Sequence, residues 1–94
     1  MSKERMVFEV SKETLLPQAT INKVIDTLFD KIEKSLANGE KIQFSGFGTF
    51  EPKKRAARIG RNPHTKEAVP IPARVIPSFK PSKKLMSKVS YEIK

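Results

Sequence analysis

The segment RIGRNPHTKE, residues 58–67, has the pattern of a hairpin tip. Asn62 and Pro63 form a turn signal, because asparagine tolerates turn conformations and proline presets its own φ. The flanking segments, residues 55–61 and 66–74, are rich in basic and small residues and offer no continuous apolar face for a core. The sequence therefore predicts a long two-stranded β-ribbon that reaches away from the body of the protein. The alternative is a disordered basic linker.

Two prolines test the predicted ribbon, because proline has no N–H to donate to a β-ladder. Pro70 and Pro72 are two positions apart, so their backbone nitrogens point to the same side of a strand. If that side faces away from the partner strand, neither proline removes a hydrogen bond. An edge strand accommodates both.

The segment before the ribbon, KIQFSGFGTFEPK at residues 41–53, alternates apolar and polar residues with period two. Ile42, Phe44 and Phe50 mark the alternation, and two glycines bracket Phe47 in a tight turn. A strand, a turn and a second strand are predicted. Three phenylalanines within seven residues are more aromatic surface than one small chain covers, which favours a dimer over a monomer with an ordinary core.

Two amphipathic helices are predicted at the start of the chain. Residues 2–13 carry Met6, Val7 and Val10 at helical spacing, and Pro17 suits the first turn of the next helix. Asn38 and Gly39 end that second helix. Its apolar stripe, which faces a core or a second subunit, consists of Ile21, Val24, Ile25, Leu28, Phe29, Ile32 and Leu36.

A short third helix is predicted at the end of the chain. Ser82 is a favourable N-cap, and Leu85, Met86 and Val89 follow it at helical spacing. The predicted order is helix, helix, strand, strand, ribbon, strand, helix.

Length and composition limit how this chain can be stabilised. A chain of 94 residues forms one domain with a small core. It has no cysteine and one histidine, which leaves neither a disulfide framework nor a Cys/His zinc site. We expect no metal and no cofactor, and a second chain could supplement the core.

The hydropathy pattern predicts a cytoplasmic protein. No apolar run approaches the roughly 18 residues that span a bilayer, and MSKERMVFEV at residues 1–10 lacks the features of a secretory signal. We expect no membrane partner.

The net charge of +9 is concentrated in one segment. Residues 1–52 hold seven Lys/Arg and eight Asp/Glu, whereas residues 53–88 hold eleven Lys/Arg and one acid, Glu67. So many like charges repel one another unless a polyanion compensates them, and nucleic acid is the natural candidate.

The predicted ribbon suits the minor groove of duplex DNA. A ribbon enters that narrow groove only if its side chains near the tip are small, as Ala56, Ala57 and Gly60 are. The arginines between them can reach phosphates or the groove floor. Pro63 is compact, rigid and without an N–H, so it can wedge between stacked bases without desolvating a donor. The alternative is that Pro63 merely shapes the turn.

Four motifs resemble the bacterial HU and integration host factor family of DNA-bending proteins. They are GFGTF at residues 46–50, RAARIGRNP at residues 55–63, IPA at residues 71–73 and PSFKPSKKL at residues 77–85. The resemblance runs essentially end to end without a gap, and the chain is most like HU. Minor-groove wedging by apolar side chains is a documented property of this family.

The resemblance implies an α+β fold in an intertwined homodimer, with a helical base, an antiparallel β saddle and two long β-ribbon arms. It assigns residues 1–39 to the dimerisation base, residues 40–54 and 74–81 to the saddle, residues 55–73 to the DNA-binding arm and residues 82–94 to the C-terminal helix. A heterodimer with a paralogue is an alternative.

Site residues follow from the same resemblance. Pro63 matches the intercalating proline, and the arm positions that line the minor groove are Arg55, Arg58, Arg61 and Asn62. The aromatic cluster at the dimer centre consists of Phe47, Phe50 and Phe79. Lysines on the body that meet DNA beside the bend are Lys3, Lys80 and Lys83. Further basic residues near the DNA are Lys53, Lys54, Arg74 and Lys84.

Several positions depart from the family pattern. Lys66 and Leu15 stand where the family commonly has glycine, after the arm tip and between the first two helices. If the backbone at Lys66 needs a positive φ, lysine costs about 1 to 2 kcal/mol there. Ser82 also replaces a common glycine, Pro70 stiffens one arm strand, and Val75 replaces a commonly polar or basic residue.

The function expected from these features is that of a histone-like, nucleoid-associated protein that binds duplex DNA with little sequence preference and bends it. Kinked, nicked or gapped DNA should be preferred. A sequence-selective factor of the integration host factor type is one alternative, because deformability can also be read as sequence. An RNA-binding protein is another, although the shallow minor groove of A-form RNA offers no slot for a ribbon. No enzyme is expected, since His64 and Glu67 provide no recognisable base with an orienting partner.

Overall fold

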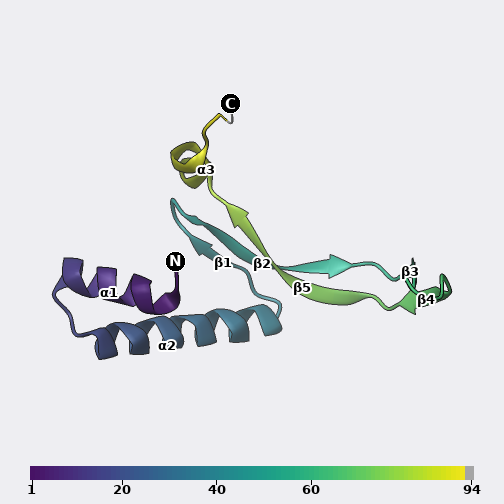
Figure 1. The fold of residues 1–94 in the computed structure, drawn as a ribbon, viewed down its shortest axis with the longest axis horizontal. Coiled ribbons are helices and arrows are strands. Elements are labelled where there is room, and N and C mark those ends of the chain that lie inside the picture. Colours follow the sequence, from purple (N-terminus) through teal and green to yellow (C-terminus); the bar gives the residue numbers. More distant parts are fainter. Residues whose placement is uncertain (93–94) are drawn as a thin grey trace. The chain divides into compact units, whose positions relative to one another are not determined.

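The computed structural model describes residues 1–92. They divide into two units, one formed by Met1–Lys34 and one that begins at Ser35. Figure 1 shows the elements in the predicted order, with the ribbon split into an inner and an outer part. The elements are α1 (Lys3–Thr14), α2 (Gln18–Ala37), β1 (Ile42–Phe44), β2 (Gly48–Arg55), β3 (Arg58–Arg61), β4 (Ala68–Ile71), β5 (Arg74–Pro81) and α3 (Lys83–Val89).

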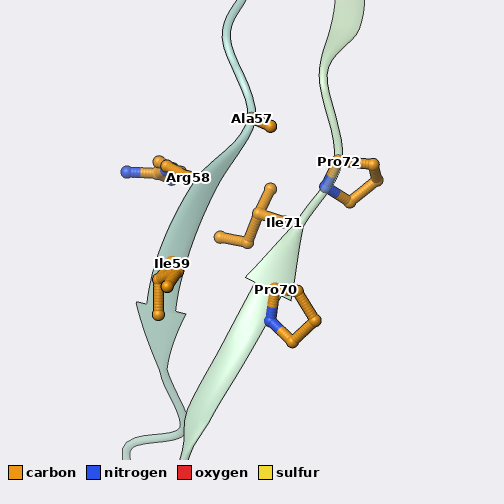
Figure 2. A pocket seen from close by; sticks show the side chains of 6 residues that line it. All are labelled: Ala57, Arg58, Ile59, Pro70, Ile71 and Pro72. Carbon is orange, nitrogen blue, oxygen red and sulfur yellow. The ribbon is translucent and has the colours of Figure 1, made fainter.

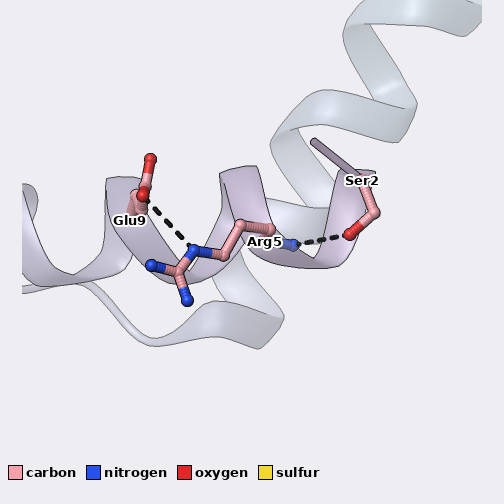
Figure 3. Close-up of polar contacts among 3 residues, drawn as sticks. All are labelled: Ser2, Arg5 and Glu9. Carbon is pink, nitrogen blue, oxygen red and sulfur yellow. Dashed lines mark hydrogen bonds and ion pairs between the residues drawn. The ribbon is translucent and has the colours of Figure 1, made fainter.

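Helix α1 begins and ends with local hydrogen bonds. The Ser2 side chain accepts a hydrogen bond from the Arg5 backbone N–H at 3.2 Å, and Arg5 Nε lies 3.3 Å from Glu9 Oε1 one turn later (Figure 3). The helix ends at Leu15, which has φ 61 and donates its N–H to the Ser11 carbonyl at 2.9 Å. A left-handed residue at a helix end is usually glycine, so a leucine there carries backbone strain.

Pro17 starts α2 from outside the helix rather than from within its first turn. Its carbonyl accepts hydrogen bonds from the backbone N–H of Thr20 at 3.1 Å and of Ile21 at 3.2 Å. Proline therefore serves as the residue before the helix, where its missing N–H is not needed.

The predicted stop at Gly39 is confirmed. Gly39 has φ 81 and donates to the Leu36 carbonyl at 3.0 Å, while Glu40 donates to the Ser35 carbonyl at 2.9 Å. This pair of bonds is a Schellman motif, which satisfies the last carbonyls of α2.

Only part of the predicted apolar stripe of α2 is covered. Among the described residues, the buried hydrophobic side chains are Val7, Ile21 and Ile32. Leu28 and Phe29 remain 43% and 56% exposed, although they belong to the same predicted stripe. The single chain therefore leaves apolar helix surface open to solvent.

Strands β1, β2 and β5 form an antiparallel sheet in that order. The turn between β1 and β2 closes with a hydrogen bond from the Phe47 N–H to the Phe44 carbonyl at 2.9 Å, and Gly46 has φ 79. A turn with a positive φ at its third residue favours glycine. The tight turn predicted around Phe47 is confirmed.

Prolines in β2 and β5 stand where the ladder needs no N–H. Ser82 donates to the Phe47 carbonyl at 2.9 Å, which fixes that pair as hydrogen-bonded. Because bonded and non-bonded pairs alternate in an antiparallel ladder, the next pair is non-bonded, as is every second pair after it. Prolines occur at just these non-bonded pairs, namely Gly48–Pro81 and Pro52–Pro77.

The outer ribbon of β3 and β4 continues the residue register of β2 and β5. Its hydrogen-bonded pairs, however, fall where continued alternation from the β2–β5 ladder would place non-bonded pairs. Asn62 donates to the Glu67 carbonyl at 2.9 Å, so alternation makes the Ile59–Pro70 pair non-bonded. Pro70 thus removes no ladder bond, as the sequence predicted. Pro72 lies between β4 and β5, outside both strands.

Pro72 explains why the ribbon is interrupted between its inner and outer parts. Pairing resumes at Arg58–Ile71 after Arg55–Arg74, with two residues left out on each strand and no bulge. The inner ladder would require an N–H from Pro72, which proline lacks. The two strands therefore separate at this point. They pair again in the same register, with the alternation of bonded and non-bonded pairs displaced by one residue.

Helix α3 is shorter than the predicted segment of residues 82–94. Ser82 caps it as expected, because its side-chain oxygen accepts from the Leu85 N–H at 3.1 Å. The helix ends at Val89, since Ser90 has an extended backbone with ψ 130. Residues 90–92 are not helical, and residues 93–94 of that prediction lie outside the described residues. Up to residue 92, none of the helices is long and apolar enough to cross a membrane.

Candidate nucleic-acid interface

The inner sheet, formed by β1, β2 and β5, has two chemically different faces. Side chains alternate between faces along a strand, and directly paired residues share a face. Phe50 pairs with Phe79, and both share the face of Gly48. The opposite face carries the basic side chains of Lys53, Arg55, Arg74 and Lys80, which we call the basic face.

Four phenylalanines form a continuous aromatic cluster in the second unit. Ring centroids lie 6.1 Å apart for Phe44–Phe50, 4.8 Å for Phe50–Phe79 and 5.6 Å for Phe47–Phe79. Gly48 makes room for the cluster, because a Cβ at this position would lie 2.5 Å from the Phe79 ring. Phe47 and Phe79 are still 51% and 40% exposed.

Like charges face each other at the outer end of the basic face. Arg55 and Arg74 are directly paired across β2 and β5, and both side chains are exposed. Like charges in directly opposite positions destabilise a sheet unless an anion lies nearby. This pair therefore concentrates positive charge at the outer end of the sheet.

A concave surface lies where the ribbon is interrupted, and three of its lining residues are arginines. It is lined by Arg55, Ala56, Ala57, Arg58, Ile71, Pro72, Arg74 and Ile76. An adjoining depression further out contains Ile59 and Pro70. Figure 2 shows Ile71 between the two strands, Pro70 and Pro72 on the outer side of their strand, and Arg58 directed away from the ribbon.

The outermost turn connects Arg61 to Ala68 and has Pro63 in its first half. The Asn62 side-chain oxygen accepts hydrogen bonds from the backbone N–H of His64 at 2.9 Å and of Thr65 at 3.4 Å. Lys66 has φ 61. The positive φ considered for Lys66 from the sequence is thus confirmed.

The small residues of the arm lie among its arginines. Gly60 is half-buried, and a Cβ at this position would lie 2.8 Å from Ile71 Cδ1. Ala56 and Ala57 lie at the interruption. Apart from the arginines, the residues between Arg55 and Asn62 are Ala56, Ala57, Ile59 and Gly60, and of these four only Ile59, which is 76% exposed, has a large side chain.

Lys3 differs from the other predicted DNA-binding residues. It lies in the first unit, whereas the rest lie in the second. Its Nζ is 2.6 Å from Asp26 Oδ1, in an ion pair whose side chains are 48% and 63% exposed. Sequence reasoning missed Asp26, because no local pattern relates residues 23 positions apart.

Within residues 1–92, the remaining cations of the predicted site form no ion pair with a carboxylate. Among residues 1–92, the ion pairs are Lys3–Asp26, Arg5–Glu9 and Lys34–Asp30. None of them involves a cation of residues 53–88, where the positive charge is concentrated. Lys83 and Lys84 begin α3, and Lys84 Cδ would lie 3.6 Å from a Cβ at Gly46. The fold therefore leaves these charges available to an external polyanion.

Comparison with known proteins agrees with this geometry. Residues 1–90 match the family model described as bacterial DNA-binding protein. The chain is 46% identical over 89 residues to DNA-binding protein HU of Thermus thermophilus, covering 95% of this chain and 92% of that protein. It is 43% identical over 90 residues to DNA-binding protein HU 1 of Bacillus subtilis, covering 96% and 98%.

Solved structures agree with the sequence relatives. A structure of Anabaena HU in a cocrystal with DNA superposes with a TM-score of 0.91 at 33% identity, covering 96% of this chain and 98% of that one. HU from Thermotoga maritima superposes with a TM-score of 0.70 at 30% identity, covering 96% and 100%. With its three helices, antiparallel saddle and β-ribbon arm, this chain belongs to the HU family of bacterial DNA-binding proteins.

Proposed function

We propose that this HU-family protein bends duplex DNA by laying its arm in the minor groove and inserting Pro63 between base pairs. The family consists of non-enzymatic architectural DNA-binding proteins, so the chemistry is binding and deformation rather than catalysis. One observation carries the proposal. A two-stranded ribbon, whose cations form no ion pair with a carboxylate among residues 1–92, ends in a turn that contains an exposed proline.

The cations supply affinity and the proline supplies deformation. Arg55, Arg58 and Arg61 contact phosphates or the groove floor, because minor-groove proteins use such side chains there. Pro63 costs the DNA a few kcal/mol of stacking, which is regained when the bent duplex meets more positive surface. The flanking DNA then meets the body through Lys3, Lys53, Arg74, Lys80, Lys83 and Lys84. Lys54 lies on the other face of the sheet, the face of Phe50 and Phe79.

A second copy of the chain completes the bound form. In the second unit, Phe47 and Phe79 are half-exposed members of an aromatic cluster, and in the first unit Val24 and Phe29 are 62% and 56% exposed. Large apolar side chains in such numbers are normally covered in a stable protein. We infer a homodimer in which residues 1–39 form the base and two arms embrace one duplex.

Low sequence selectivity follows from the same chemistry. The arm carries arginines rather than a set of amide side chains that could read base edges, and the minor groove distinguishes base pairs poorly. Selection then falls on deformability, so that bent, nicked or gapped DNA is preferred. In the cell, the protein would then be associated with the nucleoid, and its bending of DNA would compact the nucleoid.

A gel-shift comparison at two salt concentrations tests the proposal. Intact, nicked and gapped duplexes of two unrelated sequences are titrated, with duplex RNA as the competitor control. We expect tighter binding to nicked and gapped DNA, little difference between sequences, and a fall of log K with log salt of about 0.9 per phosphate neutralised. Equal affinity for all three DNA forms, or effective competition by RNA, would reject the proposal.

A further inference from the structure

The turn at the tip of the arm is organised around one side chain, that of Asn62. Its Oδ1 accepts hydrogen bonds from the backbone N–H of His64 at 2.9 Å and of Thr65 at 3.4 Å. Its own backbone closes the turn, since the carbonyl accepts from Lys66 N–H at 2.8 Å and the N–H donates to the Glu67 carbonyl at 2.9 Å. Asn62 therefore takes part in four hydrogen bonds that hold the residues following it.

The same turn contains a strained residue. Lys66 has φ 61, a conformation that costs a residue with a Cβ more than it costs glycine. The strain lies one position before Glu67, where the chain rejoins the ladder. Two further bonds support this region, from Arg61 Nη1 to the Lys66 carbonyl at 3.3 Å and from the Glu67 N–H to Thr65 Oγ1 at 3.4 Å. Backbone hydrogen bonds of Asn62 and side-chain bonds to the turn backbone therefore hold this strained turn together.

Pro63 lies inside this set of bonds but takes part in none of them. It follows Asn62 directly and precedes His64, whose N–H is bound by the Asn62 side chain. The position of the proline ring is therefore fixed by the bonds on either side of it. The Asn62 side-chain oxygen is therefore engaged by the turn, whereas the two N–H donors of the same carboxamide are a separate group.

We propose that Asn62 is a positioning residue, which acts on DNA through Pro63 by holding the turn against the strain at Lys66. This inference rests on the proposed function, because it concerns how the proline is presented to the duplex. It assigns the Asn62 side-chain oxygen to the turn, whereas the resemblance to the HU family implies direct contact of Asn62 with the minor groove. The carboxamide oxygen serves the turn, and the DNA meets the proline that the turn presents.

The first test needs no DNA and uses the full-length protein. NMR spectra give the amide shifts of His64 and Thr65 and the three-bond coupling that reports φ at Lys66. We expect Asn62→Ala to shift these signals and to lower the population of the closed turn about fivefold, the ratio typical of a lost capping side chain. Asn62→Asp keeps an acceptor oxygen and should keep the turn. Unchanged signals in Asn62→Ala would overturn the inference.

The second test measures bending at saturating protein, so that differences in affinity do not enter. Energy transfer between dyes at the ends of a nicked duplex reports the bend angle. We expect Asn62→Ala to bend the duplex less than wild type does, and Asn62→Ala combined with Lys66→Gly to recover much of the bend, because glycine removes the strain that the cap opposes. Lys66→Gly alone is the matched control, and the bend angle it gives is the reference for the double variant.

Recovery of the bend by Lys66→Gly distinguishes a positioning role of Asn62 from direct contact of Asn62 with DNA. If the Asn62 carboxamide bound DNA itself, Lys66→Gly could not replace that contact, and absence of rescue would overturn the inference. A wild-type protein that leaves DNA straight would overturn the proposed function and with it any role of Asn62 in bending. The NMR spectra would still decide whether Asn62 holds the turn, so the two failures are distinguishable.

Discussion

Leu15 and Lys66 share one unusual backbone conformation, since both have φ 61 although they lie in different units of the chain. Among residues 1–92 they are the only residues other than glycine with a positive φ. Leu15 ends α1, and Lys66 ends the turn at the arm tip. Both stand where the resemblance to the HU family predicts glycine. The backbone at both positions therefore has the glycine-type conformation while the side chain is a larger one.

Replacing Leu15 with glycine should stabilise the protein. The leucine side chain is 88% exposed, so its removal costs little burial, whereas relief of the left-handed strain contributes about 1 kcal/mol. Thermal unfolding should show a higher Tm for Leu15→Gly. Leu15→Ala is the control, because it keeps the strain and should change stability by no more than about 0.5 kcal/mol. A lower Tm for Leu15→Gly than for Leu15→Ala would contradict this account.

Most of the fold could be predicted from the sequence, because its local signals agree with one another. The apolar period of α2, the Gly39 stop, the turn around Phe47 and the Ser82 cap were each predicted from a few neighbouring residues, and the structure confirms them. Asn62-Pro63 likewise located the tip of the ribbon. Such features depend on hydrogen bonds within five residues, and these are the ones that sequence reasoning handles best.

Two features that depend on contacts between separated segments could not be predicted. The Lys3–Asp26 ion pair joins two helices, and only their packing brings its members together. The interruption of the ribbon depends on hydrogen-bond phase, which differs between the Phe47–Ser82 and Asn62–Glu67 ends. The sequence shows Pro72, but it does not show whether the alternation of bonded and non-bonded pairs requires an N–H at that position. The cap formed by the Asn62 side chain was missed for another reason, since an asparagine before proline equally suits DNA contact.

The Asp26 carboxylate should restrain Lys3 from binding DNA. Breaking an exposed ion pair costs the folded protein less than about 1 kcal/mol, so Asp26→Asn should leave the Tm nearly unchanged. It frees one ammonium, and if Lys3 then meets a phosphate, the slope of log K against log salt should steepen by about 0.9. Gel shifts across a range of salt concentrations measure this slope.

Asp30→Asn is the matched control for Asp26→Asn. It removes the same charge from α2 and also breaks an ion pair, that of Asp30 with Lys34 at 2.9 Å. Lys34 is not among the residues expected to meet DNA. Equal steepening in both variants would mean that only net charge matters and that Lys3 has no special place in the interface.

Phe47→Ala should weaken the dimer. The Phe47 ring is 51% exposed in the single chain, and its centroid lies 5.6 Å from that of Phe79. If a second subunit covers this ring, removing it loses packing both within the chain and across the dimer interface. A buried phenylalanine truncated to alanine typically costs about 3 to 5 kcal/mol. The Tm should fall and should depend strongly on protein concentration, because dissociation then accompanies unfolding.

Phe8→Ala is the control for the aromatic cluster. Phe8 is 40% exposed on α1, and the cations of Arg5 and Lys12 lie 5.6 Å and 5.4 Å from its ring centroid. Its exposed ring therefore already has partners within the chain, and its loss should cost no more than about 1 kcal/mol. Analytical ultracentrifugation should detect dissociation of Phe47→Ala at concentrations where Phe8→Ala remains associated. If both variants remain associated at every concentration, the aromatic cluster is internal to one chain.

Pro63→Ala should separate binding from bending. The cations of the arm remain, so affinity for gapped DNA should fall little, whereas the preference for nicked over intact duplex should fall by about tenfold as the stacking cost no longer has to be met. Energy transfer should report a smaller bend. Pro70→Ala provides the comparison, because Pro70 lies on the same arm at a non-bonded pair and its replacement leaves the ladder intact. An unchanged bend in Pro63→Ala, or an equal loss in Pro70→Ala, would show that arm stiffness rather than a wedge at the tip deforms the DNA.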